Sequence, residues 1–299
     1  MDQHLLVFVT VAEKKNFSRA AEALHMTQPA VSQYVKTLEQ DINATLLERN
    51  NKMVRMTKAG EVVYHHAKEI LGLYARMKTL VVDLMQTAGG PLAIGASYSF
   101  GEYVLPQLLA DLLQQYPLIK PSVMIGNSAS VADKISRRQL DIGIIEGDVH
   151  DQKLAVQPLV KDYMMVVVSH NHRFARKKQV ELADLQQETW IVREEGSGTR
   201  EMTEKMFSLH QFKPEKTMEF GSTQLIKESV AAGIGVSFLS QWTIRRDLEA
   251  GTLKALPLKE FPFTRNFSLI TQATPFQTKA AKVFLELMEQ NAPRLHLFD

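Results

Sequence analysis

A run of short polar side chains between residues 28 and 36 has the composition of a surface that contacts nucleic-acid bases. Apolar residues recur at spacings of three and four through the same stretch, which predicts a helix with one buried face. That buried face would consist of Val31, Val35, Leu38 and Ile42. Amide and hydroxyl groups on the opposite face can donate to and accept from base edges in a major groove, and a lysine adds a cation. The opposite face carries Gln28, Pro29, Ser32, Gln33 and Lys36.

A shorter helix is predicted directly before this one. Ser18 is expected to cap it, because its hydroxyl oxygen can accept from the unpaired N–H groups of the first turn. His25 and Met26 then form a short turn. Thr27 is expected to cap the second helix, where Pro29 occupies the first turn without losing a hydrogen bond. Two helices, a tight turn and a polar second helix predict a helix-turn-helix.

The alternative for this stretch is an ordinary helical hairpin with a solvated face. Residues 14–58 hold eight basic and four acidic residues, a net charge of +4, whereas the whole chain is +2, and this imbalance favours DNA binding. A preceding helix that contains Leu5 and Phe8 can cover the pair, and a basic loop after the pair can form a wing over phosphates. The residues predicted to contact DNA are Ser18, Arg19, Thr27, Gln28, Pro29, Ser32, Gln33, Lys36, Arg49, Lys52 and Arg55.

Residues 58 to about 86 are predicted to form one long helix, capped by Thr57. At about 1.5 Å per residue it would be roughly 45 Å long. Its apolar residues alternate spacings of four and three, a heptad repeat that favours a coiled-coil seam and therefore a homodimer. The alternative is an amphipathic helix that lies on its own domain. Residues 88–91 are expected to end the helix as a hinge. The predicted seam consists of Val63, Ala67, Ile70, Tyr74, Met77, Val81 and Leu84.

From Pro91 onward, short apolar strands alternate with helices, which predicts an α/β domain with parallel strands joined by helices. Ligands of such sheets bind beyond the carboxyl ends of the strands. Several loops there place small hydroxyl-bearing residues at helix starts, where free N–H groups suit a small oxyanion or carboxylate. The simpler interpretation is that each of these residues only caps its helix. The candidate effector-binding residues are Ser97, Ser99, Asn127, Glu146, Ser197, Thr199 and Thr223.

Glu146 differs from the other candidates, because its charge would repel an anion. With an anionic effector, we expect the Glu146 carboxylate to be protonated or paired, with Arg200 or Lys227 as the partner. With an amino-acid-like effector, Glu146 would instead recognise an amine. The neighbouring hydroxyl donors and glycines favour the anion, a sulfur oxyanion or a small carboxylate.

Other functional classes find less support. The chain lacks a nucleophile elbow, a P-loop and a GxGxxG dinucleotide loop, so we expect no enzyme. It has no cysteine, and His170 and His172 lie beside four cations, so no metal or other cofactor is expected. Without a signal peptide or an apolar run of membrane-spanning length, we expect a cytoplasmic protein that does not enter the membrane. The alternative function is an α/β enzyme or solute-binding protein with an incidental helical N-terminal domain.

Two segments carry a resemblance to a known family. FVTVAEKKNFSRAAEALHMTQPAVSQYVKTLE and LLERNNKMVRMTKAGE resemble the DNA-binding segment of LysR-type transcriptional regulators. Leu47 is a conservative departure, because many members have Phe there. The loop GSGTR at residues 196–200 resembles the corresponding loop in the regulators of sulfur assimilation and carbon fixation within that family.

The resemblance implies a ligand-responsive transcription factor with a mixed α/β fold. Residues 1–57 would be a winged helix-turn-helix domain, and residues 58–90 a linker helix and hinge. The effector domain would be similar to periplasmic binding proteins, with one subdomain at 91–161 plus 267–299 and another at 162–266. Crossing strands would lie near Val160–Tyr163 and Arg265–Ser268. Linker helices would pair two subunits, and effector domains would pair further into a homotetramer on bent double-stranded DNA.

Overall fold

The computed structural model describes residues 2–50, 53–83, 88–147, 149, 151–259, 262–274 and 277–295. The chain forms two units, residues 1–82 and residues 83–299, and each is described by itself. Within the described residues, no helix is long and apolar enough to cross a membrane.

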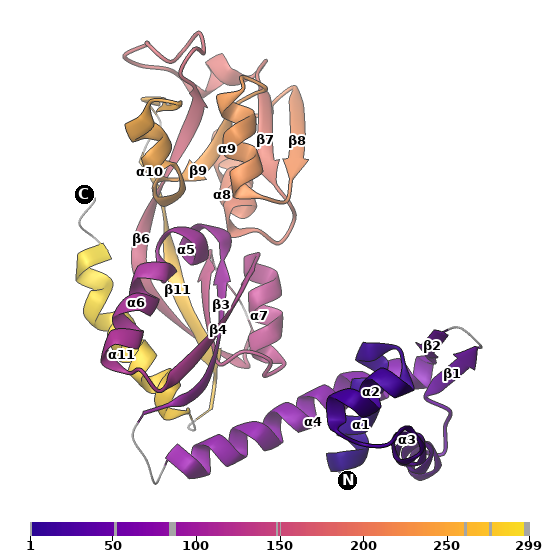
Figure 1. The fold of residues 1–299 in the computed structure, drawn as a ribbon. Helices are drawn as coiled ribbons and strands as arrows, with labels where there is room; N and C mark the ends of the chain where they lie inside the picture. Colours follow the sequence, from indigo (N-terminus) through magenta and orange to yellow (C-terminus); the bar gives the residue numbers. More distant parts are fainter. Residues whose placement is uncertain are drawn as a thin grey trace. The chain divides into compact units, whose positions relative to one another are not determined.

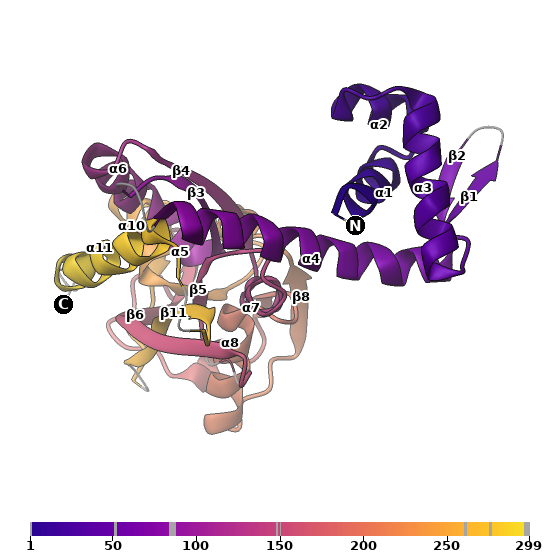
Figure 2. The ribbon, with the colours of Figure 1, turned by 90° about the horizontal axis from the view of Figure 1, so that it is seen from below.

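Before the long helix α4, the described part of the N-terminal unit combines three helices with a two-stranded hairpin (Figures 1 and 2). Its elements are α1 (Asp2–Lys14), α2 (Phe17–Leu24), α3 (Gln28–Ile42), β1 (Leu47–Asn50) and β2 (Met53–Met56). Phe8, Phe17 and Val31 share one buried core, so α1 packs against both later helices. The α2–α3 pair confirms the helix-turn-helix, and the antiparallel β1–β2 hairpin supplies the wing.

The start of α2 differs from the prediction. Asn16, not Ser18, caps the helix, and its side chain accepts from the Arg19 N–H over 3.0 Å. Asn16 has the extended backbone of a capping residue, whereas Ser18 already lies inside the first turn. At the other end, His25 takes a left-handed conformation with φ of 53°, which makes the tight turn toward α3.

The buried face of α3 is shorter than predicted. Val31, Val35 and Leu38 are buried, but Ile42 is 42% exposed, because it lies in the last turn, beyond the core of this unit. Thr27 precedes α3 in an extended conformation, without a side-chain capping hydrogen bond.

The long helix α4 (Lys58–Asp83) begins where the sequence predicts, and the Gly60 N–H donates to Thr57 Oγ1 over 2.9 Å. Its apolar stripe divides into two parts. The first part packs on the N-terminal core, with Ala67 only 1% exposed, so this half follows the alternative of a helix lying on its own domain. The second part is 39–56% exposed and consists of Ile70, Tyr74, Met77 and Val81. Leu84 lies outside the described residues.

The second unit has two halves, visible in Figure 1. In the first half, here called subdomain 1, β3 (Gly90–Ser97) pairs in parallel with β4 (Ile119–Gly126) and β5 (Ile142–Glu146). α6 (Leu105–Gln115) and α11 (Lys279–Leu295) cover one face of this sheet, and α7 (Ser128–Ser136) covers the other. A short helix, α5 (Tyr98–Tyr103), follows β3 directly, where a loop was expected. Gly90 and Pro91, expected in the hinge, belong to β3.

Two long antiparallel strands, β6 (Leu154–Ser169) and β11 (Phe263–Gln272), connect the two halves. Arg265 lies opposite Asp162 and Phe267 opposite Val160, so the predicted crossing segments lie side by side. β11 is also antiparallel to β5. The predicted parallel strands are confirmed for β3, β4 and β5, and the crossing strands add antiparallel pairs. A chain that enters subdomain 2 and returns must run along the junction in both directions.

The second half, here called subdomain 2, contains a parallel pair, two short strands antiparallel to β6, and four helical segments. Trp190 packs with Met206 on one side of this half, and Ile191 packs with Ile226 on the other, so helices cover both faces. The elements are η1 (Leu182–Leu185), β7 (Thr189–Arg193), α8 (Gly198–Leu209), β8 (Lys216–Phe220), α9 (Thr223–Ala231), β9 (Ser237–Ser240), α10 (Gln241–Ala250) and β10 (Leu253–Ala255).

Candidate functional site

The predicted effector residues come together where the carboxyl ends of the subdomain 1 strands meet subdomain 2. Ser97 ends β3, Ser99 lies in α5, and Glu146 ends β5. Asn127 and Ser197 precede α7 and α8 as caps, Thr199 lies in the first turn of α8, and Thr223 starts α9. All of these residues except Asn127 are buried.

The Glu146 carboxylate has a donor on each oxygen. Oε1 accepts from the Ser99 N–H over 3.1 Å. Oε2 accepts from Arg265 Nη1 over 2.7 Å and from Thr199 Oγ1 over 3.0 Å. Burial alone would raise the pKa of Glu146, but the Arg265 charge and these hydrogen bonds lower it below its ordinary value. Glu146 is therefore an ionised structural partner of Arg265.

Asp162 holds the other side of the same guanidinium. Its Oδ2 accepts from Arg265 Nε over 2.8 Å, and its Oδ1 accepts from Ser240 Oγ over 2.7 Å. Burial raises the pKa of Asp162 to about 6, despite the opposing effect of Arg265, and the nearby Glu146 charge adds to the rise. Of the two carboxyl groups that pair with Arg265, Asp162 therefore has a raised pKa and Glu146 a lowered one.

The expected partners of Glu146 are engaged elsewhere, which corrects the sequence prediction. Arg200 donates to Glu204 over 2.6 Å and to Glu219 over 2.8 Å. Lys227 pairs with Asp247 over 2.7 Å. Because Arg265 already pairs with Glu146, the carboxylate needs neither Arg200 nor Lys227 nor a ligand amine as its cationic partner.

A second buried cation, Arg193, lies at the end of β7. Its Nη1 donates to Thr223 Oγ1 over 2.9 Å, and its guanidinium lies 4.5 Å from the centre of the Tyr98 ring. Tyr98 belongs to subdomain 1 and stands between Ser97 and Ser99. This contact places a cation of subdomain 2 beside the hydroxyl-bearing turn of subdomain 1.

Two hydroxyl groups at this boundary still have a proton to donate, those of Ser97 and Thr223. Thr223 Oγ1 accepts from Arg193 and has no acceptor of its own among the described contacts. Ser99 Oγ accepts from Arg265 Nη2 over 3.4 Å, and its hydroxyl already stabilises the Glu146 carboxylate. Ser97 Oγ is buried near the Glu146 carboxylate, close enough to stabilise its charge but outside good hydrogen-bond geometry, and has no partner among the described residues. Buried hydroxyl groups usually find a partner, so these donors suit a bound acceptor.

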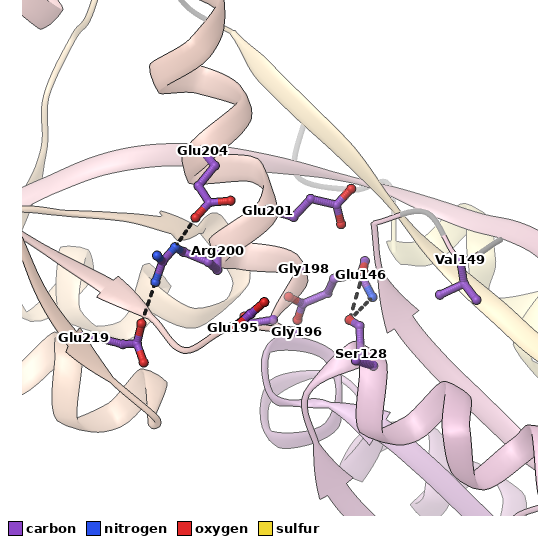
Figure 3. A pocket seen from close by; sticks show the side chains of 12 residues that line it. Ser128, Glu146, Val149, Glu195, Gly196, Gly198, Arg200, Glu201, Glu204 and Glu219 are labelled. Carbon is purple, nitrogen blue, oxygen red and sulfur yellow. Dashed lines mark hydrogen bonds and ion pairs between the residues drawn. The ribbon is translucent and has the colours of Figure 1, made fainter. Parts of the chain in front are cut away.

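The loop before α8 also contacts subdomain 1. The Ala129 N–H donates to the Gly196 carbonyl over 3.1 Å. A Cβ added to Gly198 would lie 2.6 Å from Glu146 Cβ, so only glycine allows α8 to approach β5 this closely. A pocket of about 540 Å³ lies beside this loop. Figure 3 shows side chains that line it. Two predicted effector residues, Glu146 and Ser197, are among its lining residues. Its acidic lining, which disfavours an anion there, consists of Glu146, Glu195, Glu201, Glu204 and Glu219 around Arg200.

The predicted DNA contacts lie on the N-terminal unit, largely on its surface. Gln28 Nε2 donates to Ser32 Oγ over 2.9 Å along α3, which orients both side chains. Arg49 pairs with Val54 in the hairpin, although its side chain is not described, and Lys52 lies outside the described residues. The exposed members of the set are Ser18, Arg19, Thr27, Gln28, Pro29, Gln33, Lys36 and Arg55.

Both halves of this architecture match one family. The bacterial regulatory helix-turn-helix family of lysR type matches residues 3–61, and the LysR substrate binding domain matches residues 86–293. The chain belongs to the LysR family of transcriptional regulators. It is therefore a regulator with an effector-binding domain, not an enzyme, and the alternative of an enzyme or solute-binding protein finds no support.

Named members of the LysR family are similar along nearly the whole chain. The regulator CysL of Bacillus subtilis (strain 168) is 36% identical over 96% of both chains. A probable RuBisCO transcriptional regulator of Phaeodactylum tricornutum is 30% identical over 94% of both. Among solved structures, the CcmR regulatory domain of Synechocystis PCC6803 in complex with 2-PG has a TM-score of 0.65 and 26% identity. It covers 69% of this chain, and 99% of its own length is matched.

The sequence did not predict three charged residues of this candidate site: Asp162, Arg193 and Arg265. Asp162 and Arg265 lie inside strands, where alternation of apolar residues gives no sign of a buried ion pair. Arg193 follows the apolar run of β7, so it reads as an exposed strand end. One signal was available, because a buried Glu146 requires a cation and the expected crossing segment begins with Arg265.

Proposed function

We propose that this regulator responds to a small anion bound between subdomain 1 and subdomain 2, and that it works in the cytoplasm as a homodimer joined through α4. The anion is a sulfur oxyanion, a phosphate-bearing acid or a small carboxylate. It is held by the donors that remain at the boundary, the hydroxyl groups of Ser97 and Thr223, together with the Arg193 guanidinium.

The observation that carries this proposal is the set of unused donors beside a buried cation. Arg193 and Thr223 come from subdomain 2, and the turn at Ser97–Ser99 comes from subdomain 1. A ligand that contacts both sides favours the arrangement in which they are close, and so shifts the population of subdomain positions. Glu146 was the reason to consider an amine, and its pairing with Arg265 removes that reason.

A solved relative supports a small-molecule effector. The CcmR regulatory domain, which is similar to this effector domain, was solved in complex with the small molecule 2-PG. The exposed half of the α4 stripe supports the dimer, because four large apolar side chains on one helix face are a costly surface to leave in water. Further pairing of effector domains would give the homotetramer on double-stranded DNA.

On DNA, we propose that α3 of each subunit enters a major groove and that the hairpin lies over phosphates. Gln28, Ser32 and Gln33 then read base edges, and Lys36 and Arg55 contact the backbone. A dimer with two such helices requires a site with two related halves.

Calorimetry on the full-length protein tests the effector class, with sulfate, thiosulfate, phosphate, 2-PG and acetate as probes. We expect one of these anions to bind, and Thr223→Val to weaken that binding by about tenfold or more, since a hydrogen bond to a charged group is worth about 1.5–3 kcal/mol. Thr217→Val, an exposed threonine of the same subdomain, is the matched control and should bind as the wild type does. Binding of an amine such as O-acetylserine, lost in Glu146→Gln, with no anion bound, would reject the proposal.

A further inference from the structure

Arg193 forms an ion pair through two hydrogen bonds with Glu194, the next residue in the chain. Its Nε donates to Glu194 Oε2 and its Nη2 donates to Glu194 Oε1, each over 2.7 Å. The third nitrogen, Nη1, donates to Thr223. The Arg193 side chain is 1% exposed, and a buried guanidinium needs an anionic partner at all times.

Glu194 holds this position less firmly than the arginine does. Its side chain is 24% exposed, and rotation about its own bonds carries the carboxylate into solvent without any movement of β7. A carboxylate bound to a guanidinium through two oxygens has the same geometry as a bound sulfate, phosphate or effector carboxylate. An arriving anion therefore replaces Glu194 on Arg193 while the buried charge stays paired.

The same pair also joins the two subdomains. Asn127 of subdomain 1 donates from Nδ2 to Glu194 Oε1 and to the Glu195 carbonyl, both over 3.4 Å. Tyr98 of subdomain 1 stacks on the Arg193 guanidinium. Moving the Glu194 carboxylate away from Arg193 removes the Asn127–Glu194 contact and leaves the other two in place.

We propose that Glu194 is an internal substitute for the effector: its carboxylate occupies the anion position on Arg193 in the free protein and leaves when the effector binds. This inference rests on the anionic effector proposed above. It assigns Arg193 as the residue that binds the anionic group of the effector, and Glu194 as the competitor that sets the apparent affinity. Exchange at this position breaks the Asn127–Glu194 contact, so effector binding changes the connection between the subdomains.

The test compares Glu194→Gln with the wild type and with Glu195→Gln in the full-length protein. Glu195 is the matched control, because it is exposed, carries the same charge one residue along the chain, and makes no contact with Arg193 through its side chain. If Arg193 is free of the competitor in only a fraction of the molecules, removing the competitor raises the apparent affinity for the anion by the inverse of that fraction. We expect Glu194→Gln to bind phosphate or sulfate about tenfold more tightly in calorimetry, and Glu195→Gln to match the wild type.

Thermal unfolding provides a second measurement. In a buffer whose only small anion is chloride, Glu194→Gln should melt below the wild type, because Arg193 has lost its carboxylate partner, and added phosphate should close the gap. Suppose that Glu194→Gln melts at a lower temperature, that phosphate does not restore it, and that its anion affinity is unchanged. Glu194 is then only a structural partner, and this inference is overturned. The proposal of an anionic effector would still stand. Absence of anion binding to the wild type and to every variant would overturn both proposals.

Discussion

Arg265 Nη1 donates to Glu146 Oε2 over 2.7 Å, although the two residues are 119 positions apart in the chain. Glu146 ends a strand of subdomain 1, whereas Arg265 lies on the crossing strand β11, and both side chains are at most 2% exposed. Thr199 of subdomain 2 hydrogen-bonds to both members of the pair. The ion pair therefore joins both halves of the effector domain at the strands that connect them.

Breaking this ion pair should destabilise the effector domain. Glu146→Gln should lower the free energy of unfolding by about 3 kcal/mol, because removing one partner leaves a buried charge, while Asp162 still pairs with Arg265. Urea unfolding followed by tryptophan fluorescence measures this, since Trp190 and Trp242 both lie in the second unit.

Glu204→Gln is the matched control for that experiment, because it breaks an exposed pair with Arg200 and should cost below about 1 kcal/mol. Equal small losses in both variants would mean that the buried pair contributes no more than a surface pair.

Asp162 should make the stability depend on pH. The folded chain holds its proton up to about pH 6, whereas the unfolded chain releases it near 3.8, so the free energy of unfolding should fall as pH rises between these values. The fall should reach up to about 3 kcal/mol and should be missing in Asp162→Asn. Urea midpoints at a series of pH values check this. Asp133→Asn, an exposed carboxylate on α7, should keep the wild-type profile, and an equal profile in Asp162→Asn would refute the assignment.

The exposed half of the α4 stripe should hold the dimer. Val81→Asp should weaken dimerisation by at least about tenfold, because a charge would be buried in an apolar seam. Sedimentation equilibrium measures the change. Ala75→Asp inserts the same charge off the predicted seam and should leave the dimer unchanged. A dimer that survives Val81→Asp would show that these side chains are covered in some other way.

The outer face of α3 should distinguish sequence reading from phosphate contact. Gln33→Ala should cost about 1–3 kcal/mol on DNA that the wild-type protein selects from random sequences, and much less on random DNA. Arg55→Ala should weaken binding to both kinds of DNA alike, since phosphates carry no sequence. Fluorescence anisotropy at two salt concentrations compares them. Equal losses on both DNAs for Gln33→Ala would remove it from the base-reading set.

Local patterns predicted the elements well where one periodicity dominates. The spacing of Val31, Val35 and Leu38 gave α3, and Thr57 marked the start of α4. The same reasoning could not divide the α4 stripe, because Ala67 packs on its own domain and Val81 does not, and both follow the same heptad. That difference depends on how far the N-terminal core extends along the helix.

The loops of the candidate site were predicted from the sequence, but its charged residues Asp162, Arg193 and Arg265 were not. Helix starts with small hydroxyl groups mark the carboxyl ends of strands, and Ser99 and Thr199 do meet at Glu146. The cation there comes from β11, and its neighbour Asp162 from β6, a pairing fixed by antiparallel register across 103 residues. Register between distant strands depends on the tertiary fold, which local periodicity does not contain.

The lack of space for a side chain at Gly198 predicts which mutations a genetic selection should recover. A single added methyl group at this position meets Glu146 and forces α8 away from β5, and the change lies in the second unit, whose residues do not include the helix-turn-helix. A selection for bacteria whose target gene no longer follows the effector should therefore recover alleles at codon 198. Such alleles should encode a full-length regulator that still occupies its promoter but holds transcription at one fixed level.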